Sequence, residues 1–238
     1  MIDKDLEFLS DCSNDKLLVL TDYLVFDKDG KKRLTESLSN TKEFARNYPD
    51  NLKEILPQVI DEFQRFGGNS LMNLIRKQGV NYRTILEDVC DRYKVNYNKS
   101  NSTEQLETYL LQKVLITAVD KMSDEDLSHV NAKYNKELLR QAILEGNAMA
   151  PAFLGMATLL ISQLSKAAAV KIAAVLAGGA LARIVAFANP ILAVFAAAWQ
   201  VYDFLGPAYR VTVPFVLTIA YYRKTYLLTD EELKNILK

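Results

Sequence analysis

Apolar residues recur at three- and four-residue intervals through residues 1–146, a spacing that is typical of amphipathic helices. Leu17, Leu20 and Leu24 follow this spacing after Ser13, a residue type that caps helix starts. Ser102 and Gln105 have the spacing of a capping box at the start of a long helix that runs to Met122. The pattern predicts a charged, amphipathic helical region over residues 1–146.

Weaker signals place the other elements of this region. Gly30 predicts a turn, and the Gly67-Gly68 pair predicts the end of a helix. Pro57 predicts that the helix containing it starts or kinks at that position. The further helices expected are a short one after Asp3, two pieces over Arg33–Leu38 and Thr41–Asn47, one over Asn51–Phe66, and one over Tyr82–Val95 that opens at Asn81.

The pattern changes after Gly146. Residues 147–238 form an apolar, alanine-rich region, in which 18 of the 59 residues from 147 to 205 are alanine. Asn189-Pro190 is a turn dipeptide between two apolar arms, Ile172–Ala188 and Ile191–Leu205, so a helical hairpin is expected. Tyr209–Tyr222 could be a strand, because it is rich in valine, but a helix entering at Pro214 is favoured. Thr229 can cap a short final helix.

Charge is distributed as unevenly as apolar character. The net charge of the 238 residues is zero, but residues 1–146 contain 21 Lys and Arg against 25 Asp and Glu, whereas residues 147–238 contain 8 against 4. Between residues 147 and 222 the charged residues are Lys166, Lys171, Arg183, Asp203 and Arg210. A segment with so few charges requires shelter from water, either within a helical core or in lipid.

The lengths of the uncharged segments are compatible with both a helical core and a membrane. Residues 147–165 and 184–202 each lack charge for 19 residues, close to the roughly 20 needed to span a bilayer. The arms themselves are shorter, and Arg183 within the first arm would be costly at the bilayer centre. Small residues at four-residue spacing, such as Ala193 and Ala197, allow close helix packing in either environment.

The sequence offers little support for catalysis or cofactor binding. His129 is the single histidine, and no set of Asp, Glu and Cys residues surrounds it at ligand spacing, so no metal site is expected. Phosphate-binding glycine motifs and nucleophile motifs do not occur, and zero net charge argues against a nucleic-acid partner. We therefore expect a non-enzymatic protein without catalytic, cofactor-binding or metal-binding residues.

Two cysteines, Cys12 and Cys90, have aliphatic neighbours and are expected to be buried free thiols. The first eleven residues lack the pattern of a secretory signal, which favours a reducing, cytoplasmic location, with peripheral or conditional inner-membrane association as a further option.

Several charged and aromatic residues are candidates for contacts with partners. Lys166, Lys171 and Arg183 could meet anionic lipid head groups, and Asp203, Tyr209 and Arg210 could form a conformational latch or a partner contact. The run Lys31-Lys32-Arg33, with Lys28, has two interpretations: a solvated surface, which is the usual one, or an anionic lipid or phosphate contact.

Three segments together resemble a known family: residues 65–70 (RFGGNS), 82–89 (YRTILEDV) and 208–214 (AYRVTVP). In this order and spacing the chain is similar to the uncharacterised bacterial YaaW-like family, which has been grouped with ubiquinol–cytochrome c chaperone-like domains. The resemblance spans nearly the whole chain and implies a bacterial, helical, intracellular protein. It implies no catalytic residues, and the grouping suggests an assembly factor near respiratory membranes.

These observations predict an all-α protein in which amphipathic helices accompany an apolar, alanine-rich C-terminal hairpin. The leading functional hypothesis is action at or on a membrane, through peripheral association or insertion of a conditionally exposed hairpin. The alternative is a soluble helical adaptor or assembly chaperone that binds a protein partner.

Overall fold

The computed structural model describes residues 3–27, 30–68, 79–123, 135–145, 153–157, 160–161, 208–226 and 228. Within these ranges every regular element is a helix, and the one β pairing is an isolated bridge between Phe26 and Lys32. The all-α prediction is therefore confirmed, whereas the predicted hairpin lies outside the described residues. The main elements are 3-10 helices η1 (Lys4–Asp11), η2 (Leu38–Asn40) and η3 (Leu52–Ile55), and α-helices α1 (Asn14–Val25), α2 (Lys42–Asn47), α3 (Leu56–Gly68), α4 (Tyr82–Arg92), α5 (Thr103–Lys121), α7 (Lys136–Leu144) and α11 (Tyr209–Thr225).

Helix starts follow the capping residues that the sequence provides. The side chain of Ser13 accepts a hydrogen bond from the Lys16 amide, and Asn81 caps α4 in the same way. Ser102 and Gln105 form the complete capping box at the start of α5. Each cap satisfies backbone N–H groups that the first helical turn leaves unpaired.

Three helix boundaries differ from the predictions. Arg33–Leu38 is not helical: Arg33 extends beside Val25, and regular structure resumes only at Leu38. Helix α4 ends at Arg92 rather than Val95, because Lys94 adopts a positive φ of 54°. Helix α11 begins at Tyr209, so Pro214 lies inside it rather than at its entry. Of the two possibilities predicted for Pro57, a helix start or a kink, the structure shows a start: the 3-10 helix η3 ends at Ile55 and α3 begins at Leu56.

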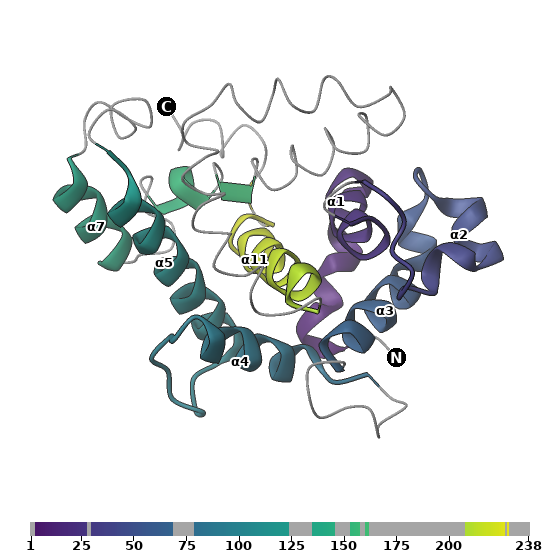
Figure 1. Cartoon of the computed structure of the whole chain (residues 1–238), viewed down its shortest axis with the longest axis horizontal. Coiled ribbons are helices and arrows are strands. Elements are labelled where there is room, and N and C mark those ends of the chain that lie inside the picture. The colour runs from purple at the N-terminus through teal and green to yellow at the C-terminus, as the bar shows by residue number, and fades with distance from the viewer. Residues whose placement is uncertain are drawn as a thin grey trace.

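Helix α11 is the central element of the fold. Figure 1 shows it in yellow between α1 and α3 on one side and α4 and α5 on the other, and it packs against all four. Every residue of α11 is buried except its three charged ones, Arg210, Arg223 and Lys224. A helix that is apolar all round is stable only when other elements surround it. This burial also explains how Pro214 is tolerated, because surrounding helices stabilise a turn that has lost one backbone hydrogen bond.

Close packing joins the surrounding helices to α11 and to each other. The rings of Phe63 in α3 and Phe215 in α11 stack with centroids 3.9 Å apart. At Gly67 a Cβ atom would lie 2.3 Å from Cγ1 of Ile85 in α4, so a larger residue would force the Ile85 side chain to move. Glycine at this position therefore allows the end of α3 to pack closely against α4.

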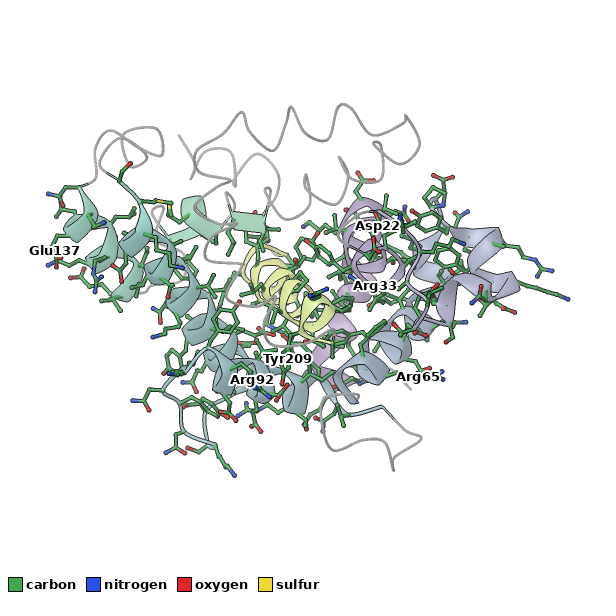
Figure 2. The ribbon with its side chains drawn as sticks, in the orientation of Figure 1. Asp22, Arg33, Arg65, Arg92, Glu137 and Tyr209 are labelled. Atoms are coloured by element: carbon green, nitrogen blue, oxygen red, sulfur yellow. The ribbon has the colours of Figure 1, made fainter. Side chains whose placement is uncertain are left out.

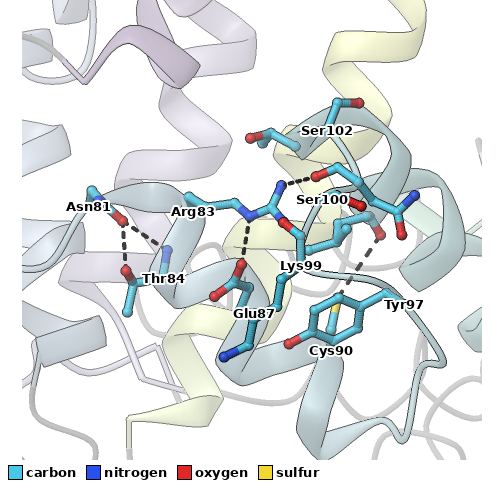
Figure 3. A network of polar contacts seen from close by, with 12 residues as sticks. Asn81, Arg83, Thr84, Glu87, Cys90, Tyr97, Lys99, Ser100 and Ser102 are labelled. Carbon is cyan, nitrogen blue, oxygen red and sulfur yellow. Dashed lines mark hydrogen bonds and ion pairs between the residues drawn. The ribbon is translucent and has the colours of Figure 1, made fainter.

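The loop between α4 and α5 is fixed by one arginine (Figure 3). Arg83 pairs with Glu87 at 2.8 Å and donates a hydrogen bond to the carbonyl oxygen of Asn101, also at 2.8 Å. Tyr97 donates to the carboxylate of Asp91. These contacts attach the loop to α4.

The apolar region contributes to the core of the helical body before α11 begins. Apart from the half-buried Gly155, the described residues within 153–157 and 160–161 are buried and belong to the same core as the N-terminal helices. The division at residue 146 remains a prediction, although α11 itself packs against helices from the first 146 residues. Over the part of the chain that the structure describes, no helix combines the length and the apolar character needed to cross a bilayer.

Both cysteines are buried free thiols, as the sequence predicts. Burial raises the pKa of the Cys90 thiol to about 12, so this group stays protonated and unreactive at neutral pH.

Candidate functional site

The most deeply buried charge in the described structure is Glu107 in α5, whose side chain is fully enclosed. Its Oε2 accepts a hydrogen bond from Nε of Arg223 in α11 at 2.7 Å, and its Oε1 accepts one from the Tyr82 hydroxyl in α4, also at 2.7 Å. Burial raises the pKa of Glu107, and the guanidinium of Arg223 opposes this shift. The three residues, called here the Glu107 cluster, join three helices at the C-terminal end of α11.

The N-terminal 3-10 helix is attached to the same cluster. Arg223 donates to the carbonyl oxygen of Asp5 and lies over the ring of Phe8, 4.3 Å from the ring centroid. Asp3 accepts hydrogen bonds from the Tyr82 amide at 2.7 Å and from the Gln64 side chain at 3.0 Å. The chain start and the C-terminal end of α11 are therefore held by one set of polar contacts.

A second polar cluster lies at the opposite end of α11 (Figure 2). The Tyr209 hydroxyl donates to Asp88 Oδ1 at 3.0 Å and accepts from Arg92 Nε at 2.9 Å. Asp88 and Arg92 are one turn apart on α4, and the Arg92 guanidinium also lies 4.9 Å from the Tyr209 ring centroid. This contact fixes the first turn of α11, directly after the alanine-rich region. The latch role predicted for Tyr209 is compatible with this position but remains a prediction.

Arg210, the other described member of the predicted latch, is exposed at the same end of α11. Asp203, the partner predicted for Arg210, lies outside the described residues. Arg210 is close enough to Arg33 to affect its pKa. Burial lowers the pKa of Arg33, the negative charge of Asp27 raises it, and the positive charge of Arg210 lowers it further. The start of α11 thus lies near the chain that follows α1.

The residues predicted to contact lipid head groups, Lys166, Lys171 and Arg183, also lie outside the described residues, so these contacts remain predictions. His129 lies outside the described residues as well. Among the residues described, no three His, Cys, Asp or Glu side chains gather into a possible metal site.

The residues of the Glu107 cluster were not among the sequence-based candidates. One signal was present: Glu107 occupies the same helical stripe as Leu110, Leu111 and Val114, which are all buried. A carboxylate in an apolar stripe indicates a buried partner. The sequence does not indicate which cation pairs with it, because Arg223 is 116 residues away.

Asp22 in α1 is one of three further carboxylates with little access to water, together with Glu36 and Glu62, and has 8% of its surface exposed. The Tyr48 hydroxyl donates to its Oδ1 at 3.0 Å. Burial raises the pKa of Asp22 to about 6, although the hydrogen bond from Tyr48 opposes the shift. Because the folded state binds this proton more tightly than the unfolded state, Asp22 reduces stability as the pH rises from about 4 to about 6.

Replacing Asp22 with asparagine should therefore stabilise the protein at neutral pH. We expect D22N to raise the free energy of unfolding by about 1–2 kcal/mol at pH 7.5 and to have little effect near pH 4. Urea unfolding of both proteins across this pH range measures the difference. D50N, at an exposed position, is the matched control, and an equal effect of the two substitutions at every pH would contradict the explanation.

Comparisons with known proteins place the chain in a family. Residues 1–34 match a family model described as a domain of unknown function, DUF3944. A UPF0174 protein of Helicobacter pylori strain J99 is 33% identical over 98% of this chain and 96% of its own length. The UPF0174 protein YaaW of Escherichia coli K12 is 33% identical over 93% of this chain and 94% of its own length.

No solved structure matches the fold. The grouping with ubiquinol–cytochrome c chaperone-like domains is not shown by these relatives and remains a prediction. The identity over nearly the full length confirms the predicted resemblance, and the chain belongs to the UPF0174 (YaaW) family.

Proposed function

We propose that this protein acts at or on a membrane without catalysing a reaction, through conditional exposure of its alanine-rich segment, residues 147–205. The single observation that supports the proposal is the charge distribution, since residues 147–222 contain only five charged side chains. Such a segment gains free energy by leaving water, and lipid is one environment that provides this gain.

The contacts of α11 give the proposal a mechanical basis. The segment continues into α11, whose first turn is fixed by Asp88 and Arg92 and whose last turn is fixed by Glu107. A segment that moved to a lipid surface would therefore stay attached to the helical body. The described side chains of the segment are buried in the core, so binding would require a conformational change that exposes them.

Vesicle binding of the purified protein tests the proposal. The wild-type protein should co-sediment with vesicles that contain phosphatidylglycerol, and A193E/A197E should reduce binding by more than about tenfold, because each charge in hydrocarbon is costly. Q58E/N96E adds the same two charges at exposed positions of the body and should bind as the wild type does.

Each failure has a distinct meaning. A wild-type protein that ignores anionic vesicles across a range of pH would refute the proposal. In that case, recovery of one stoichiometric protein partner would favour the adaptor hypothesis. Equal binding by A193E/A197E and the wild type would show that the membrane contact lies elsewhere.

A further inference from the structure

Hydrogen bonds between Asp27 and residues 30 and 31 close a turn after α1, and the residues that follow have an unusual surface. The amide of Asp27 donates to the Lys31 carbonyl oxygen at 2.8 Å, and the Lys31 amide donates to Asp27 Oδ1 at 2.9 Å. Gly30 occupies the turn with φ of 75°, which glycine adopts without strain. The Arg33 amide then donates to the Val25 carbonyl oxygen, which returns the chain to the end of α1.

This turn presents cations and an apolar side chain to solvent together. Lys31 and Lys32 are exposed, and Leu34 is completely exposed, at 101% of its reference area. Arg33 is directed inward instead, because its Nε donates to the Tyr23 carbonyl oxygen at 3.3 Å. An exposed leucine beside two lysines has no role in the core, which the rest of the described chain fills without it.

The position of the turn relative to α11 is the second observation. Helix α1 is antiparallel to α11: Lys16 near its start lies 5.6 Å from the Tyr222 ring centroid, whereas Arg33, beyond its end, lies near Arg210. In Figure 2, Arg33 lies on the α1 side of α11, and Arg92 and Tyr209 lie on its α4 side. The turn therefore lies at the end of α11 where the alanine-rich segment joins the body.

We propose that Lys31, Lys32 and Leu34 form a docking surface for anionic lipid, which places the junction of the alanine-rich segment at the membrane. Two lysines provide attraction to anionic head groups, and the leucine enters the interface between head groups and acyl chains. This inference rests on the proposed function and names the part of the body that approaches the lipid first. Asp27 and Asp29 offset two of the four positive charges that residues 28–33 contain, so the segment keeps a net positive charge.

Two variants of the full chain test this docking surface. K31E/K32E should weaken binding to phosphatidylglycerol-containing vesicles by at least about tenfold at low salt, because each lysine near an anionic surface contributes roughly a fivefold gain. The loss should shrink at high salt, where charges are screened. L34S should weaken binding about fivefold regardless of salt, since its contribution is apolar.

Matched controls separate a local effect from a general one. K99E/K113E reverses two exposed lysines in the α4–α5 loop and in α5, and L138S replaces the half-exposed leucine of α7. Both controls should bind within about twofold of the wild type, and all variants should melt as the wild type does, because the changed side chains are on the surface.

The outcomes distinguish this inference from the proposed function. Binding that is lost in A193E/A197E but unchanged in K31E/K32E and L34S would overturn the docking surface and leave the proposed function intact. Equal losses in K31E/K32E and K99E/K113E would also overturn it, because they would indicate attraction to net charge alone. A wild-type protein that does not bind would overturn both.

Discussion

Replacing Arg223 with methionine should lower the free energy of unfolding by about 3–5 kcal/mol, because it leaves the Glu107 carboxylate buried and without its cation. Glu107 is fully enclosed, and Arg223 is its ion-pair partner at 2.7 Å. The substitution also removes the hydrogen bond to the Asp5 carbonyl oxygen and the contact with Phe8. Urea unfolding at neutral pH measures the loss.

An exposed ion pair of the same length provides the matched control. Arg65 and Asp61 in α3 are also 2.7 Å apart, but both side chains are more than half exposed. R65M should therefore cost no more than about 1 kcal/mol. If R65M and R223M destabilised the protein equally, burial would not determine the strength of the pair.

A double variant separates the cost of an unpaired charge from the value of the pair. E107Q/R223M removes both charges, and the glutamine oxygen can still accept from the Tyr82 hydroxyl. It should be more stable than R223M alone, because burying a neutral amide costs less free energy than burying a carboxylate. A double variant less stable than R223M would contradict this account.

The helices that were predicted well are those with local signals. Ser13, Asn81 and Ser102 each satisfy backbone groups within three residues of themselves, so their role can be read from adjacent sequence. The all-α class and the two buried thiols follow from equally local patterns. Arg33–Leu38 was misassigned because Arg33 is held by the Tyr23 carbonyl oxygen, a contact made by folding back on α1.

The polar clusters could not be predicted, because their members come from distant parts of the chain. Tyr209 and Asp88 are 121 residues apart, and Arg223 and Glu107 are 116 apart. A single sequence shows that a charge lies in an apolar stripe but not which opposite charge meets it. Pro214 illustrates the same limit, since the helices surrounding α11 override the local preference of proline for a helix start.

Replacing Phe215 with alanine should cost about 3–5 kcal/mol, the largest packing loss expected from a single truncation in α11. Phe215 is fully buried and stacks on Phe63, with the ring planes 11° apart. Because close-packed helices on both sides prevent full collapse, most of the resulting cavity should remain. L138A, at a half-exposed position of α7, should change stability by less than about 0.5 kcal/mol.

The same substitution connects packing to the proposed function. Phe63 contacts Phe215 on one side and Tyr82 of the Glu107 cluster on the other, with ring centroids 6.3 Å apart in the second pair. F215A should therefore loosen α11 as a unit rather than only its middle turn. If the alanine-rich segment is released when α11 loosens, F215A should bind anionic vesicles more strongly than the wild type under conditions where both remain folded. Weaker or unchanged binding would show that release does not depend on the packing of α11.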